Sequence, residues 1–193
     1  MGRTSLFKIF FTSLIVFSLI APAAAWSKTY QISAADSSVD FEVTHQIGFT
    51  TGIIPIGEGT IDADEKTFKL DKIVLTLDAK GVNTYNPDRD AVVTSKDFLD
   101  SQNFPTIRLS SDKINEKTLT AQVTIKDITK KVTFDYKLIG MGKTQEGKAK
   151  TLVFLSGRLS KKDFNITYNV TDESGQTLLG DDVDVLLRLV GIE

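Results

Sequence analysis

Apolar and polar residues alternate along five stretches of this 193-residue chain. A period of two is typical of a β-strand with one buried face, because successive side chains point to opposite sides of the strand. Where one face is buried and the other solvated, the strands are usually antiparallel. The apolar sets are Val39, Phe41 and Val43, with His45 in register; Ile73, Leu75, Leu77 and Ala79; Leu119, Ala121, Val123 and Ile125; Val132, Phe134, Tyr136 and Leu138; and Val183, Val185, Leu187 and Leu189.

Turn-forming residues separate these stretches and several shorter apolar runs. Asn115-Glu116-Lys117, the glycine-rich segment 140–148 and Ser174-Gly175 each interrupt a periodic run. About eight or nine strands result, and eight antiparallel strands can close into a barrel with room for one small ligand. The sequence therefore predicts an all-β fold, a closed antiparallel barrel of about eight strands. Residues 26–193 contain no linker or fixed-period repeat, so we expect a single domain.

Residues 81–104 break the strand pattern. Asn86-Pro87 is typical of a helix start, with an N-cap followed by proline at the first helical position. Thr94 and Asp97 have the spacing of a capping box, which indicates a second short helix. We therefore expect a short helical insertion near residues 86–103, placed as a lid or plug at one end of the barrel.

The first 25 residues have the features of a secretory signal peptide. Arg3 and Lys8 make the first eight residues basic, residues 9–20 are apolar or carry a hydroxyl, and Ala23-Ala24-Ala25 fits the small-residue cleavage rule. The apolar run is shorter than the roughly 20 residues that a membrane-spanning helix needs. We expect cleavage after Ala25 and export to the periplasm of a bacterium.

The composition excludes several functional classes. The chain has no cysteine and one histidine, which leaves no credible thiol or histidine-assisted nucleophile and no set of converging zinc ligands. We therefore expect no enzymatic activity, no metal and no cofactor. A net charge of −2 lacks the basic excess that binds nucleic acid.

Motifs in order along the whole mature chain resemble those of the YceI-like polyisoprenoid-binding family. They are Tyr30-x-Ile32; Ser37-x-Val39-x-Phe41-x-Val43-x-His45; Arg89-Asp90; Ser95-x-Asp97-Phe98; Phe104-Pro105-x-Ile107; Thr124-Ile125 with Ile128-Thr129-Lys130; Asp163-Phe164; Tyr168-Asn169; and Gly180-Asp181-Asp182-Val183. The resemblance implies an exported, lipocalin-like barrel that binds an isoprenoid. Lys161 stands where the family usually has arginine.

The candidate ligand-binding residues follow from the strand pattern and from the resemblance. We expect apolar residues of the inward faces, aromatic residues of the insertion and of the Asp163-Phe164 motif, and a few polar residues that select a head group. A structural role explains His45 better than a ligand-binding role, and Arg89 and Asp90 are equally well explained as a local ion pair that fixes the insertion. The candidates are Phe41, Val43, His45, Arg89, Asp90, Phe98, Phe104, Ile107, Phe134, Tyr136, Phe164, Val185 and Leu187.

Two functional hypotheses fit these observations. In the first, the barrel encloses an isoprenoid, such as a quinone or a polyprenyl chain, or another long-chain lipid, for transport, storage or sensing. A weak basic cluster at Lys126, Lys130 and Lys131 is compatible with peripheral contact with a membrane. In the second, the barrel is filled by its own side chains and acts as a stress-response or protein-interaction module. Either a monomer or a homodimer is compatible with the sequence.

Overall fold

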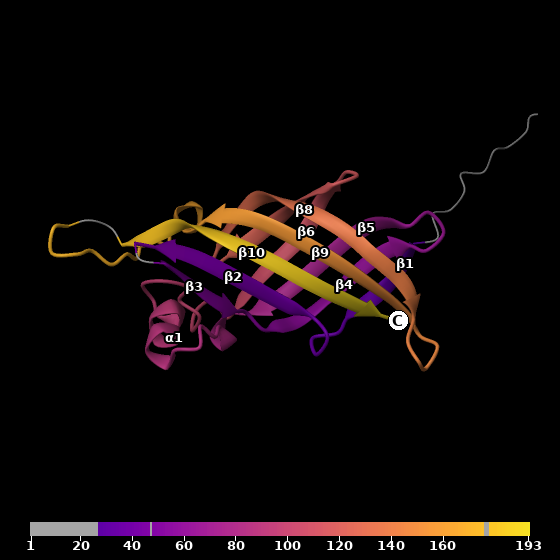
Figure 1. The fold of residues 1–193 in the computed structure, drawn as a ribbon, viewed down its shortest axis with the longest axis horizontal. Helices are drawn as coiled ribbons and strands as arrows, with labels where there is room; N and C mark the ends of the chain where they lie inside the picture. The colour runs from indigo at the N-terminus through magenta and orange to yellow at the C-terminus, as the bar shows by residue number, and fades with distance from the viewer. Residues whose placement is uncertain (1–26, 47, 176–177) are drawn as a thin grey trace, which may run out of the picture.

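The computed structural model describes residues 27–46, 48–175 and 178–193, and these form ten strands around one core (Figure 1). The predicted signal peptide lies outside the described residues. The strands are β1 (Ser27–Ile32), β2 (Ser38–His45), β3 (Gly48–Ile53), β4 (Ile56–Asp64), β5 (Lys69–Asp78), β6 (Thr106–Ile114), β7 (Thr118–Ile125), β8 (Ile128–Lys143), β9 (Ala149–Ser160) and β10 (Leu179–Ile192).

Eight of the strands close a hydrogen-bonded ring in the order β1-β4-β5-β6-β7-β8-β9-β10. All pairings in the ring are antiparallel, and it closes where Ile32 of β1 pairs with Gly191 of β10. The remaining two strands extend the wall. β2 pairs with the first part of β10, from Leu179 to Arg188, and β3 pairs with β2. The predicted closed antiparallel barrel of about eight strands is confirmed.

The alternating stretches bury the faces that their apolar residues share. On β7, for example, Leu119 and Ala121 are fully buried while Gln122 between the buried positions is exposed. The buried residues of all ring strands form one continuous core. Burial of this apolar surface is the main stabilising contribution to a chain that has no cysteine to cross-link.

The segment between β5 and β6 contains the short 3-10 helix η1 (Ala79–Gly81) and the only α-helix of the described residues, α1 (Pro87–Thr94). Asn86 is the N-cap of α1, as predicted, and its side-chain oxygen accepts hydrogen bonds from the backbone N–H groups of Asp88 and Arg89. The predicted second helix at Thr94–Asp97 is wrong. Thr94 is the last residue of α1, and its hydroxyl donates a hydrogen bond to the carbonyl of Asp90 in the preceding turn instead of capping a new helix. Residues 95–103 form turns.

Helix α1 lies beside β3 at the end of the barrel from which the loop preceding β10 projects (Figure 1). That loop follows β9 and a second 3-10 helix, η2 (Lys161–Phe164). Both long irregular segments therefore gather at one end. Among the described residues, no helix is long and apolar enough to cross a membrane.

Candidate functional site

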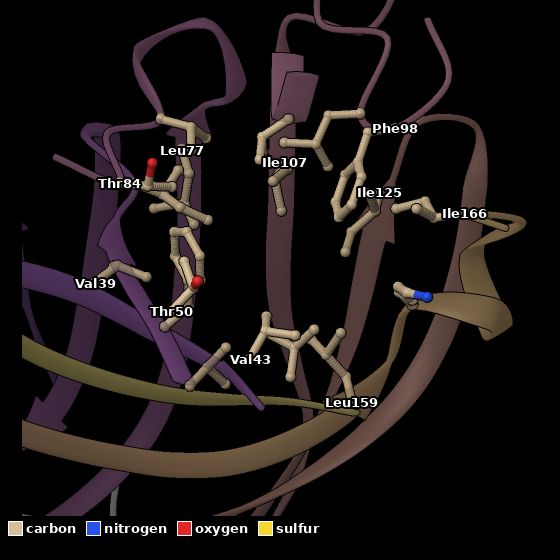
Figure 2. Close-up of a pocket in the computed structure, with 18 of the residues that line it drawn as sticks. Val39, Val43, Thr50, Leu77, Thr84, Phe98, Ile107, Ile125, Leu159 and Ile166 are labelled. Carbon is tan, nitrogen blue, oxygen red and sulfur yellow. The ribbon is translucent and has the colours of Figure 1, made fainter. Parts of the chain in front are cut away.

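A cavity of about 500 Å³ lies inside the barrel, toward the end where α1 is found. Figure 2 shows side chains from opposite walls pointing into a shared open space, among them Val39, Leu77, Ile107 and Leu159. Aliphatic and aromatic groups dominate this wall. It can therefore accept an apolar molecule without leaving polar groups unsatisfied.

Most of the sequence-predicted binding residues contribute to this wall. They come from strands of the ring, from β2 and from the segment between β5 and β6. The side chains are Phe41, Val43, Arg89, Phe98, Ile107, Phe134, Val185 and Leu187.

The other five candidates lie away from the cavity. Tyr136 shares the inward face of β8 but lies further along the strand, where its hydroxyl donates to the carbonyl of Asn115. Phe164 is fully buried in the core, and Phe104 is half-buried at the end of the turns that follow α1. His45 ends β2 beside Gly48, and the carboxylate of Asp90 faces the turn before α1.

The segment between β5 and β6 closes part of the cavity, as the lid interpretation predicted. Val82, Val93 and Leu99 of this segment lie on the wall. The ring of Phe98 packs against the ring of Tyr168, with 5.9 Å between their centroids and an angle of 57° between their planes. This contact joins the two irregular segments at the end of the barrel.

Sequence reasoning missed many wall residues. Most of those on strands continue the predicted alternation, so the period-two signal could have found them. Thr50 lies on β3, where no alternating stretch was predicted, and Leu179 precedes a register shift in β10. The wall residues in irregular segments carried no such signal. The strand residues are Val39, Thr50, Leu75, Leu77, Leu109, Val123, Ile125, Leu159, Leu179 and Val183. The residues outside strands, apart from those named above, are Ile54, Thr84, Asn86, Asp88, Val92, Lys161, Ile166 and Val170.

Arg89 and Asp90 both bind Thr84, which is 2% exposed and lies on the cavity wall. Asp90 Oδ1 accepts hydrogen bonds from the Thr84 hydroxyl at 2.6 Å and from its backbone N–H at 2.7 Å. The Arg89 guanidinium donates from Nε to the Thr84 hydroxyl oxygen and from a terminal nitrogen to the Thr84 carbonyl. The two hydrogen bonds that Thr84 donates to Asp90, with a smaller contribution from the charge of Arg89, hold the pKa of Asp90 below its usual range.

The Arg89–Thr84–Asp90 network fixes the turn that leads into α1. The predicted local ion pair is replaced by two separate sets of hydrogen bonds to one threonine, and no Arg89–Asp90 ion pair occurs among the residues the structure describes.

Lys161 is the charged residue with the deepest burial in the described part of the chain, with 2% of its surface exposed. It begins η2, lies on the cavity wall, and its Nζ is 2.9 Å from Oδ1 of Asp181 on β10. The ammonium of Lys162 binds the other oxygen of Asp181 at 2.6 Å. The hydrogen bonds from Lys162 and Lys161 lower the pKa of Asp181.

Comparisons with known proteins agree with this architecture. The chain is 28% identical to a UPF0312 protein of Staphylococcus aureus (strain N315) over 156 residues. These residues make up 80% of this chain and 91% of that protein. The YceI protein of Campylobacter jejuni has a similar solved structure, with a TM-score of 0.65 and 23% identity over 77% of this chain and 87% of that one. BcnA of Burkholderia cenocepacia has a TM-score of 0.66 and 16% identity, covering 82% and 98% of the two chains.

The family model described as the YceI-like domain matches residues 30–191, which include the whole cavity wall and every ring strand except the first three residues of β1 and the last residue of β10. The chain belongs to the YceI-like domain family.

Proposed function

We propose that this protein is an exported binding protein that encloses a long apolar lipid in its barrel, and that the lipid is an isoprenoid such as a quinone or a polyprenyl chain. The observation that carries the proposal is the apolar cavity of about 500 Å³ inside a closed ring of strands. This volume lies within the range of about 300–1,000 Å³ typical of small-molecule sites. The isoprenoid assignment rests on the family resemblance.

Burial of an apolar chain supplies enough free energy for such binding without reactive groups. Each buried CH₂ contributes about 0.8 kcal/mol, so ten carbons of a tail contribute roughly 8 kcal/mol before the entropic cost of association. The side chains of Val43, Ile125 and Leu159 present the apolar surface that such a tail would contact (Figure 2). The few polar groups of the wall would then discriminate between head groups.

The cavity supports lipid binding over the alternative of a stress-response or interaction module with a filled barrel. Protein cores pack to a density near 0.75, and voids of several hundred cubic ångströms are rare in a core with no ligand to bind. An open space of this size next to tightly packed ring strands is what a binding protein requires.

Mass spectrometry of an organic extract tests the proposal. The full chain is expressed with its own leader in a bacterium that makes quinones and polyprenyl lipids, purified without detergent, and extracted. We expect close to one isoprenoid per protein. Substoichiometric traces of mixed lipids, in a protein that also fails to take up added isoprenoid, would favour the filled-barrel alternative.

The site of action follows from the same proposal. A lipid carrier cleaved after Ala25 would work in the periplasm, with peripheral contact at a membrane during lipid exchange. Fractionation with N-terminal sequencing of the mature protein tests export and cleavage. Flotation with anionic vesicles tests membrane contact.

A further inference from the structure

The ammonium of Lys161 has unused hydrogen-bonding capacity. A lysine side chain carries three N–H donors. Among the residues that the structure describes, Asp181 Oδ1 is the one acceptor within hydrogen-bond distance of the Lys161 Nζ. Two donors of a buried ammonium therefore have no protein partner, and a buried charged group needs such partners to offset its lost hydration.

The charges around Lys161 do not balance. Lys161 and Lys162 share the single carboxylate of Asp181, so the group carries one excess positive charge. Neither Asp163 nor Asp182 forms an ion pair with these lysines in the described part of the chain. Lys162 is 61% exposed at its side chain and is screened by water, whereas Lys161 is buried at the cavity.

The surroundings place Lys161 on the wall of the cavity. Leu179 and Val183, the wall residues that flank Asp181 on β10, lie beside the apolar space, and so does Leu159 just before η2. Leu159 and Ile166 are seen across the cavity from Thr84 in Figure 2. The Lys161 group is thus separate from the Arg89–Thr84–Asp90 network, where Arg89 is exposed and two of its five N–H donors bind Thr84.

We propose that Lys161 is a head-group site for the carboxylate of a single-chain amphiphile whose tail lies in the cavity. This inference rests on the proposed enclosure of a long apolar lipid, and it makes the polar end of that lipid a carboxylic acid rather than the uncharged head of a quinone. A carboxylate supplies oxygens for the two unpartnered N–H donors and the one negative charge that balances the group. A phosphate monoester carries about −1.5 to −2 charges at neutral pH and would leave excess negative charge in an apolar space.

Length-matched ligands separate the head group from the tail. Lipid-stripped protein is titrated by calorimetry with oleate, oleyl alcohol and oleyl phosphate. We expect oleate to bind about 10- to 100-fold more tightly than oleyl alcohol, because charge-assisted hydrogen bonds replace neutral ones. Oleyl phosphate is expected to bind more weakly than oleate.

Variants assign the difference to Lys161. Lys161→Met removes the ammonium and leaves Asp181 paired with Lys162, so oleate affinity is expected to fall to that of oleyl alcohol. Lys161→Arg keeps the charge and is expected to keep most of the preference for the acid. Lys131→Met is the matched control, since Lys131 forms an exposed ion pair with Asp112 on the surface.

The outcomes distinguish the two proposals. Equal binding of oleate and oleyl alcohol, or an acid preference that survives in Lys161→Met, overturns the head-group site while the lipid-binding function stands. Tighter, Lys161-dependent binding of oleyl phosphate overturns the choice of a carboxylate. If the protein binds none of the three ligands and no isoprenoid, the proposed function fails and the head-group site fails with it.

Discussion

Gly157 of β9 lies directly opposite Phe134 of β8, and a Cβ atom at Gly157 would come within 2.6 Å of Phe134 Cδ1. Phe134 is 1% exposed and its ring forms part of the cavity wall. The absence of a side chain at Gly157 is what allows the ring to lie against the sheet instead of filling the cavity.

Gly157→Ala is expected to push the Phe134 ring toward the cavity. The variant should lose about 1–3 kcal/mol of unfolding free energy, the usual cost of overpacking a core, and should bind lipid more weakly. Chemical denaturation and lipid titration measure both effects. Gly142→Ala on β8 is the control, because a Cβ there meets nothing within 4 Å. Equal stability of the two variants would contradict the packing argument.

Filling the cavity should remove lipid binding without unfolding the barrel. Leu159→Trp adds a large ring to the wall at the end of β9, and we expect at least a tenfold loss of affinity for oleyl alcohol as buried tail surface is lost. Ile139→Trp, at a position 40% exposed on β8, adds the same ring away from the wall and should bind normally. Unchanged lipid binding in Leu159→Trp would show that the ligand lies elsewhere.

The Thr84 hydroxyl should support both the turn before α1 and the pKa of Asp90. In Thr84→Val the hydroxyl bonds to Asp90 and Arg89 are lost while the side-chain shape is kept, so we expect a loss of about 1–3 kcal/mol. The pKa of Asp90, measured by carboxyl-carbon NMR, should rise toward its ordinary value of 3.8. Thr84→Ser keeps the hydroxyl and should keep both properties. A pKa unchanged in the valine variant would assign the shift to another group.

The Asp181 carboxylate should contribute to the stability of the folded protein, because it offsets the buried charge of Lys161. Asp181→Asn is expected to cost about 2–3 kcal/mol, somewhat less than the loss for a fully buried pair, since Asp181 is one-third exposed. Adding Lys161→Met should restore most of that stability, because no uncompensated buried charge remains. A double variant that is less stable than Asp181→Asn would contradict this account.

The Lys161–Asp181 pair predicts that the stability of the protein falls in acid. The pKa of Asp181 is lower in the folded protein than its ordinary value of 3.8, so the folded state binds fewer protons than the unfolded state near that pH. Its contribution to stability is therefore present above the ordinary value of 3.8 and is lost as the pH falls through the lowered pKa. Urea denaturation between pH 2.5 and 6 should show a smaller acid loss in the double variant Lys161→Met, Asp181→Asn than in the wild type.

Local sequence patterns determined which face of each strand is buried and where α1 begins. Side chains alternate strictly along a strand, so the positions of Ile107 and Leu187 on an inward face follow from their neighbours alone. The start of α1 likewise depends on Asn86 and Pro87, which are adjacent in the chain. The prediction of a second helix failed at Thr94 because its hydroxyl instead bonds within the last turn of α1.

Only the tertiary structure decided which inward positions border open space and which polar groups are buried among them. Phe134 and Tyr136 share one face of β8, yet only Phe134 reaches the cavity, because depth along the barrel depends on strands distant in sequence. The sequence around Lys161 gives no sign that its side chain is buried. It can be buried because folding brings Asp181, 20 residues away, within 2.9 Å of its ammonium, and an attraction of that kind exists only after the chain has closed.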